Sequence, residues 1–257
     1  MIRLSPPRRV LHAIIGIAGA AGLAELAARA GLVDSEVIPP VSVVLRRAAG
    51  LLADAGFGDD VAVTLEGWIA GLLLAVAVGV PAGLVLGQFR ALSAAASPLV
   101  EFLRTLSPVS LIPLAIVMFP ETFQMKVFLT FFAALWPILV NTLYALRDVD
   151  PVAKDTLKSF GFGPLSVLWR VSLPSAAPFV MTGVRIAASV GLIVIVSGEL
   201  LAGDGTGIGG YITETQSSGG HTDLMLAAAL WTGVIGVAAN SALVRMERRA
   251  FRWRAAA

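Results

Sequence analysis

The chain has 257 residues, of which 57% are hydrophobic and only 14% are charged, and its formal net charge is +2. Soluble domains carry about 25% charged residues, so this composition excludes an ordinary soluble protein and favours a membrane protein. The small net charge gives no overall basic field of the kind that favours nucleic-acid binding. Because the chain has no cysteine, disulfides, thiolate metal sites and cysteine nucleophiles are excluded.

Six apolar stretches approach the roughly 20 residues that a membrane-spanning helix needs. In chain order they are residues 11–31, 67–87, 91–119, 127–146, 177–201 and 224–244. The first contains Glu25 and Arg29 and the third contains Glu101 and Arg104, each pair one helical turn apart and able to form an ion pair. The sequence therefore predicts an all-α membrane protein with about six transmembrane helices.

The basic residues predict how these helices are oriented. Six spans place the lysines and arginines of both termini and of the second and fourth loops on one side, with Arg46, Arg47 and Lys126 as exceptions. Since cytoplasmic loops carry an excess of lysine and arginine, we expect both termini in the cytoplasm.

Residues 1–60 are expected to form a transmembrane helix followed by an extracytoplasmic amphipathic segment over 33–60. An alternative is that the run PPRRVLH begins a twin-arginine signal that is cleaved after the first apolar stretch. That alternative leaves five spans.

A polar, basic loop over residues 147–176 interrupts the apolar chain. Asp150, which is followed by proline, predicts a helix start. Gly161 suits the end of that helix. Pro164 is expected to begin a second short helix and Pro174 to end it.

This loop carries several apolar side chains. Leu157 and Phe160 share one face of the first predicted helix, and Leu165, Leu168 and Trp169 share one face of the second. One interpretation is that they pack on the protein's own helix ends or on lipid. The other is that a cytoplasmic partner covers them, as in the docking of a helix in a groove.

Four polar side chains within the predicted spans are candidates for a substrate pathway. They are Arg104, Asn141, Arg185 and Glu199. Charged residues in a span face protein or water, and an arginine there can attract an anionic substrate. The alternative is that the arginines pair with Glu101, the loop or lipid headgroups and only hold helices in place.

Other motifs point to no chemistry. The run over 205–210 satisfies G-x-G-x-x-G, but it follows a membrane span rather than a strand, so we expect a flexible outer loop and no nucleotide site. The sequence contains no G-x-x-x-x-G-K-[ST] motif. His12 and His221 belong to no metal-ligand spacing, so no metal site is expected.

The spacing Asp155-x5-Gly161-x9-Val171-x-Leu173-Pro174 resembles the EAA loop of ATP-binding-cassette (ABC) importer permeases. The opening triplet keeps the acidic residue and lacks both alanines of the family pattern.

The flanking sequences SPLVEFLRTLSPVSLIPLAIVMF and GVRIAASVGLIVIVSGELL are also similar to the taurine, alkanesulfonate and nitrate branch, and the resemblance covers residues ~60–250. The residues Met118-Phe119-Pro120-Glu121 stand where family members usually have an aromatic-glycine pair.

The resemblance implies a type I importer (MetI-like) permease fold, with a permease core over 61–250 and a coupling loop over 147–176, in a bacterial cytoplasmic (inner) membrane. It implies two ATPase subunits that hold ATP and Mg, a second permease copy in a homodimer, an extracytoplasmic solute-binding protein, and no cofactor on this chain. The substrate is expected to be a small solute such as a sulfonate or nitrate. The residues implied to couple to the ATPase are Asp155, Gly161, Pro164, Leu168, Trp169, Leu173 and Pro174.

Two other function classes are alternatives to an ABC importer permease. An autonomous secondary transporter or channel would use Arg104, Arg185 and Glu199 in an ion relay, which leaves the apolar loop without a purpose. An enzyme would need a catalytic constellation, and the sequence contains none that we recognise.

Overall fold

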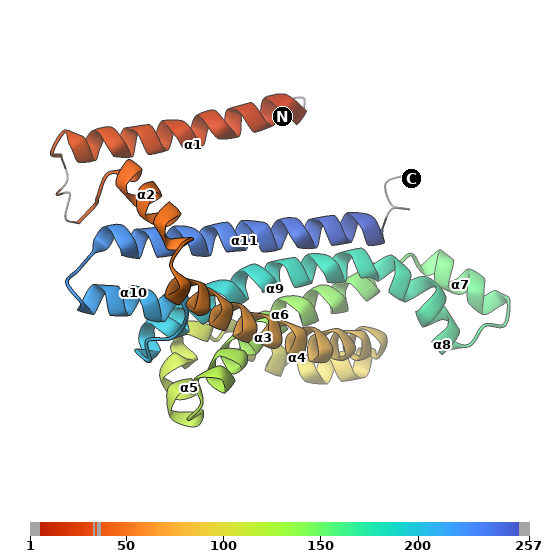
Figure 1. Cartoon of the computed structure of the whole chain (residues 1–257). Helices are drawn as coiled ribbons and strands as arrows, with labels where there is room; N and C mark the ends of the chain where they lie inside the picture. The colour runs from red at the N-terminus through yellow and green to blue at the C-terminus, as the bar shows by residue number, and fades with distance from the viewer. Residues whose placement is uncertain (1–5, 33, 35–36, 252–257) are drawn as a thin grey trace.

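The computed structural model describes residues 6–32, 34 and 37–251, and the described part of the chain is helical, without strands. The elements in chain order are α1 (Pro6–Arg29), α2 (Val41–Leu51), α3 (Ala55–Gln88), α4 (Arg90–Thr105), the 3₁₀ turn η1 (Pro108–Leu111), α5 (Ile112–Met118), α6 (Thr122–Arg147), α7 (Pro151–Ser159), α8 (Pro164–Val167), the π turn η2 (Leu168–Ser172), α9 (Leu173–Ala202), α10 (Gly207–Ser217) and α11 (Thr222–Ala250). Figure 1 shows α2, α5 and α10 at one end of the bundle and α7 and α8 at the other.

Four described helical segments are long and apolar enough to cross a membrane: α3, α6, the stretch Pro164–Ser217 that runs from α8 to α10, and α11. The bent pair formed by α4 and the segment Pro108–Met118 makes a fifth candidate. These five coincide with the second to sixth predicted spans. The first predicted span lies in α1, whose opening side chains fall outside the described residues.

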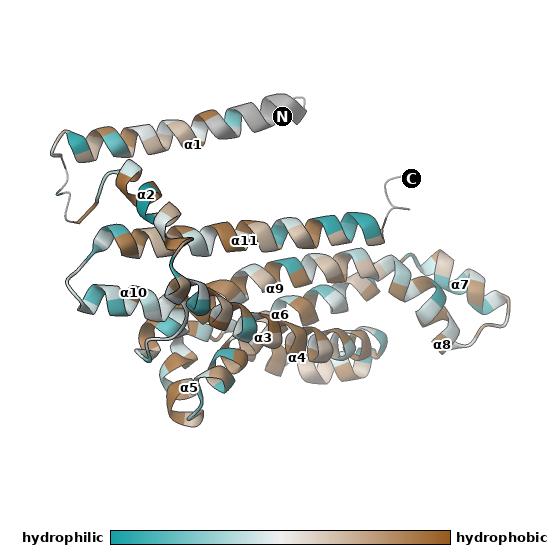
Figure 2. Cartoon of the chain, in the orientation of Figure 1, coloured by the Kyte–Doolittle hydropathy of each residue, from teal (hydrophilic) through white to brown (hydrophobic). Residues whose placement is uncertain are grey.

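The centre of the bundle is α6, which packs against α3 on one side and α9 on the other. Ala75, Ala134, Ile138 and Ala187 form a buried cluster where the three helices meet. Figure 2 shows these helices as mostly hydrophobic and α7 as largely hydrophilic.

The contact between α3 and α6 depends on small residues spaced by four along α3. These residues are Gly67, Gly71, Ala75, Gly79 and Gly83. A spacing of four places them on one helical face. They let the backbone of α3 lie directly against α6, which is how helices associate inside a membrane.

Replacing Gly71 with alanine is expected to push α3 away from α6. A Cβ at this position would lie 2.5 Å from Cβ of Thr130 and 2.8 Å from the carbonyl oxygen of Val127. Overpacking of this kind costs about 1–3 kcal/mol, so the Tm of the purified protein should fall. The matched control is Gly58→Ala on the same helix, where no atom lies within 4 Å of the added Cβ. Equal Tm values for the two variants would contradict the close contact.

The predicted boundary at residue 60, where the surface segment ends and the permease core begins, differs from the structure. The helix α3 begins at Ala55, where the carboxylate of Asp54 accepts a hydrogen bond from the backbone N–H of Gly56 (3.0 Å). It therefore includes the end of the predicted surface segment 33–60 and crosses the predicted domain boundary between residues 60 and 61. The remainder of that segment contains the short amphipathic helix α2.

The third predicted span is not one straight helix. Its two halves meet at an angle of 80° between Thr105 and Pro108. Ser107 has extended backbone angles, as a residue before proline favours, and Pro108 then opens the 3₁₀ turn. Leu106 and Pro108, at this bend, line a pocket together with residues of α6.

Candidate functional site

The loop between α6 and α9 has the predicted start and glycine turn. The carboxylate of Asp150 accepts a hydrogen bond from the backbone N–H of Val152 (2.8 Å) and caps α7. Gly161 has a φ of +81°, which favours glycine, and it ends α7. Beyond it, Pro164 begins α8.

The prediction that Pro174 ends the second helix is wrong, because the helix continues through the π turn Leu168–Ser172 into α9. A proline has no N–H to donate, and its ring crowds the carbonyl four residues earlier. A π turn shifts the hydrogen-bond pattern just before Pro174, so the proline is accommodated without a break.

Five large apolar side chains of the described loop are exposed, among them Val152 and Phe162. We call the other three the loop patch: Phe160 (78% exposed), Leu165 (70%) and Trp169 (63%). Leu168 does not share their face, contrary to prediction, because it packs against Ala145, Leu146 and Ala176. The interpretation in which the protein's own helix ends cover these residues therefore holds for Leu168 and not for the loop patch.

The loop is fixed to the end of α6 by Lys154. Its ammonium donates a hydrogen bond to the backbone carbonyl of Leu146 (2.9 Å). Burial, followed by the neighbouring positive charge of Lys158, lowers the pKa of Lys154. Asp155, the acidic residue of the loop motif, is exposed and pairs with Lys158 at 2.8 Å. The exposed residues of the loop are therefore carried on an anchored support.

Arg104 and Asn141 line one pocket of about 310 Å³, which we call the central pocket, between α4, α6 and α9. The guanidinium of Arg104 lies 2.7 Å from the carboxylate of Glu101, so the expected ion pair is present. The amide of Asn141 donates to the carbonyl of Pro137 (2.8 Å). Trp136 also lines this pocket, and its indole Nε1 is buried without a hydrogen-bond partner among the described residues.

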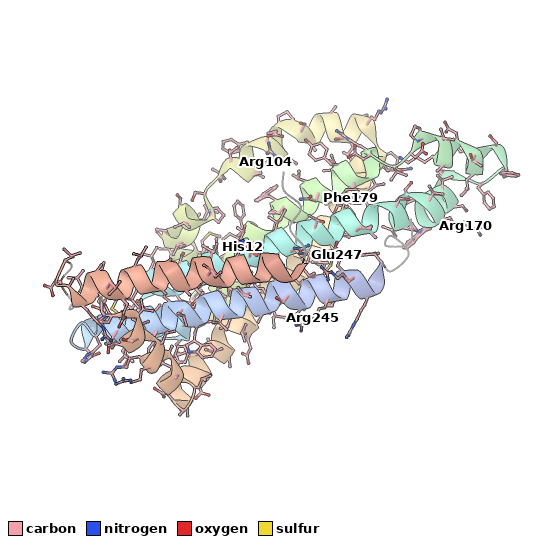
Figure 3. The ribbon with its side chains drawn as sticks, turned by 90° about the horizontal axis from the view of Figure 1, so that it is seen from above. His12, Arg104, Arg170, Phe179, Arg245 and Glu247 are labelled. Carbon is pink, nitrogen blue, oxygen red and sulfur yellow. The ribbon has the colours of Figure 1, made fainter. Side chains whose placement is uncertain are left out.

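Arg185 lies elsewhere. It binds Asn240 (3.3 Å) and Glu247 (3.1 Å) on α11 and so ties α9 to α11. Figure 3 shows Glu247 on α11, apart from Arg104 on α4. This pairing agrees with the interpretation that the arginine holds helices in place.

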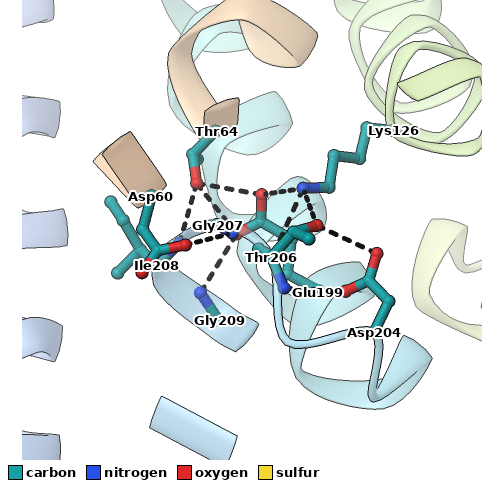
Figure 4. A network of polar contacts seen from close by, with 9 residues as sticks. All are labelled: Asp60, Thr64, Lys126, Glu199, Asp204, Thr206, Gly207, Ile208 and Gly209. Atoms are coloured by element: carbon teal, nitrogen blue, oxygen red, sulfur yellow. Dashed lines mark hydrogen bonds and ion pairs between the residues drawn. The ribbon is translucent and has the colours of Figure 1, made fainter. Parts of the chain in front are cut away.

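Glu199 is the centre of a buried network at the end of the bundle opposite α7 (Figure 4). Its carboxylate lies 3.0 Å from the ammonium of Lys126, and the two side chains are only 0% and 1% exposed. The hydroxyl of Thr64 donates to the same carboxylate at 2.9 Å. Lys126 also donates to the hydroxyl of Thr206 (3.1 Å).

The glycine-rich run completes this network. It is not the flexible loop that the sequence predicted, because Gly207–Gly210 are buried and open α10. The N–H of Gly209 donates to Glu199 (3.0 Å), that of Gly207 to Asp60 (2.9 Å), and that of Ile208 to the Thr64 hydroxyl (2.9 Å). A helix N-terminus attracts anions, and here the anions are carboxylates of the same chain.

The structure thus separates the predicted pathway residues. Arg104 and Asn141 share the central pocket, Arg185 joins α9 to α11, and Glu199 belongs to the buried network. An ion relay through Arg104, Arg185 and Glu199 is therefore not formed in this structure.

Sequence reasoning missed Lys126 and Trp136. Lys126 is one of three exceptions to the charge bias of the loops, which was a weak signal, since the other two, Arg46 and Arg47, are exposed. Trp136 offers no such signal, since a tryptophan in an apolar span is ordinary.

Comparisons with known proteins agree with this fold. A nitrate import permease of Leptolyngbya laminosa is 28% identical over 73% of this chain and 67% of its own length. A bicarbonate transport system permease of Synechocystis is 26% identical over 93% of this chain and 88% of its own length. The solved methionine ABC transporter MetNI, in an inward-facing conformation, has a TM-score of 0.67 and 17% identity over 76% of this chain and 95% of that chain, so the two share a fold.

A family described as the inner membrane component of binding-protein-dependent transport systems matches residues 79–252, which is more than half of the chain. The chain therefore belongs to this family, and it is a permease subunit of an ABC importer.

Proposed function

We propose that this permease subunit imports a small anion and is driven by ATPase subunits that dock on the loop patch. Two ATPase subunits, which hold ATP and Mg, two copies of this chain and an extracytoplasmic solute-binding protein make up the proposed assembly. Both termini lie in the cytoplasm in this assembly.

The exposed loop patch is the observation that carries the coupling proposal. Phe160, Leu165 and Trp169 project from an anchored support at the end of the bundle, and exposed apolar groups of this kind mark interaction sites. The sequence has no phosphate-binding loop of its own. In the proposed cycle, the ATPase binds one arrangement of the two loops better than the other and so shifts the population of transporter states.

The distribution of charge supports the proposed orientation. Arg90, Arg147, Lys154 and Lys158 all lie around one pocket at the α7 end of the bundle. The helix α11, with arginines in its last turn, ends at the same side (Figure 1). Cytoplasmic segments carry such an excess of positive charge.

The central pocket supports an anionic substrate. Arg104 supplies a positive charge to the lining of this pocket, and the amide-bearing Asn141 and Trp136 lie beside it in the same lining. A substrate anion would compete with Glu101 for the guanidinium. Two relatives are named as nitrate and bicarbonate permeases, and both of these solutes are small oxyanions.

Replacing Arg104 with glutamine is expected to lower uptake by at least about tenfold, because a hydrogen bond to a charged group contributes roughly 1.5–3 kcal/mol. The measurement is uptake of isotope-labelled nitrate or bicarbonate into vesicles that contain the complete complex. Arg104→Lys should retain part of the uptake, and Arg46→Gln, an exposed position on α2, should retain all of it. Full uptake by Arg104→Gln, with normal ATPase assembly, would exclude this pocket as the substrate site.

A further inference from the structure

A second, strongly basic pocket lies beside the coupling loop, away from the central pocket. It has a volume of about 630 Å³ and lies between the end of α3, the start of α4, the end of α6 and α7. Its charged lining residues are Arg90, Arg147, Lys154 and Lys158, and no acidic residue of the described chain lines it. We call it the basic pocket.

The protein's own groups offset little of this charge. Arg147 donates to the neutral hydroxyl of Ser93 (2.6 Å) and Lys154 to a backbone carbonyl. Of these four cations, only Lys158 has a carboxylate partner within the described residues, and that partner is Asp155. Four cations against one carboxylate leave a net charge of about three, and burial, followed by repulsion from Lys158, lowers the pKa of Lys154. A bound anion would relieve this repulsion.

The position of the basic pocket matches the depth of lipid headgroups. The membrane-spanning helix α3 ends at Gln88 and α6 ends at Arg147, and both residues line the pocket. The ends of spanning helices lie where the hydrocarbon core meets the polar headgroups. Basic pockets between helices on the cytoplasmic side bind anionic headgroups.

A groove between α4 and α6 adjoins the basic pocket and shares Arg147 with it. Apolar residues, among them Leu86, Val100, Leu139 and Leu143, line the groove together with the polar residues Ser93, Ser97, Glu101 and Arg104. Its volume of about 70 Å³ holds only the first methylenes of an acyl chain. A lipid headgroup beside Arg147 would place the start of its acyl chain against these apolar side chains, a contact that inorganic phosphate cannot make.

We propose that the basic pocket binds the headgroup phosphate of an anionic phospholipid, with the start of an acyl chain at the groove between α4 and α6. Two of the four cations belong to α7, so the lipid links the coupling loop to the ends of α3 and α6. Binding does not depend on which solute the permease carries.

The test is equilibrium binding of tail-labelled phosphatidylglycerol to the full-length chain in detergent, measured by fluorescence anisotropy. Each basic residue near an anionic surface contributes about fivefold, so Arg90→Gln with Arg147→Gln should weaken binding about 30-fold. The matched control is Arg245→Gln with Arg249→Gln, which removes the same charge from exposed positions on α11, outside the pocket. Arg90→Gln alone, at an exposed side chain, should weaken binding about fivefold and serves if the double variant does not fold.

Competition identifies the source of the phosphate. Unlabelled phosphatidylglycerol should displace the probe, and phosphatidylethanolamine and inorganic phosphate at equal concentration should not. Equal displacement by inorganic phosphate would overturn the lipid assignment in favour of a free-anion site. Equal losses of binding in the pocket and α11 variants would overturn the site itself.

Discussion

Replacing Trp169 with aspartate is expected to abolish co-purification of the ATPase with this chain and, with it, ATP-driven uptake. Trp169 is exposed in the loop patch beside Leu165, and a buried tryptophan at an interface often contributes 2 kcal/mol or more to binding. The variant also places an unpaired carboxylate in the contact, which adds a desolvation cost. The measurement is affinity purification of the tagged chain, co-expressed with its ATPase.

Two further variants show whether a loss reflects the contact or the fold of the loop. Trp169→Phe keeps an apolar ring and should retain most of the ATPase. Gly161→Pro should lose it, because proline fixes φ near −65° where the loop requires +81°. Both loss variants should leave the membrane-embedded helices folded. Normal recovery of the ATPase with Trp169→Asp would exclude docking through the loop patch.

Replacing Lys126 with methionine is expected to destabilise the protein by about 3–5 kcal/mol. The substitution leaves the carboxylate of Glu199 buried without its cation, and removing one partner of a buried ion pair costs this much. The measurement is the Tm of the purified chain, together with its yield from membranes.

The matched control for this prediction is Lys158→Met. It also removes the lysine of a lysine–carboxylate pair, but both Lys158 and Asp155 are exposed, so the loss should stay below about 1 kcal/mol. A second variant, Lys126→Met with Glu199→Gln, removes both charges and should recover part of the lost stability. If Lys126→Met is tolerated as well as Lys158→Met, the buried pair does not hold the helices together.

Local patterns predicted much of the fold. The apolar stretches located five of the long elements, and the Asp150 cap and the Gly161 turn were found from the residues alone. These features depend on residues that are neighbours in the chain, so a short stretch of sequence is enough to predict them. The ion pair between Glu101 and Arg104 was predicted for the same reason.

Features that depend on distant parts of the chain were not predicted. Lys126 and Glu199 are far apart in sequence, and only the packing of α6 against α9 brings them together. The N-terminus of α10 was taken for a flexible outer loop because the run follows a membrane span, whereas its glycines, which lack a side chain, allow close packing. Leu168 was placed on the docking face because the π turn, which redirects the side chains after Val167, leaves no clear sequence signal.

The central claim, that the ATPase docks on the loop patch, is tested most directly by crosslinking from a single thiol. The chain has no cysteine, so Leu165→Cys carries a unique reactive group in the patch and Phe123→Cys a matched exposed one at the opposite end of the bundle. A thiol-reactive photocrosslinker on Leu165→Cys should join the chain to the ATPase in the assembled transporter, and the same reagent on Phe123→Cys should not. Absence of the crosslink from Leu165→Cys in a complex that retains ATPase would contradict the account.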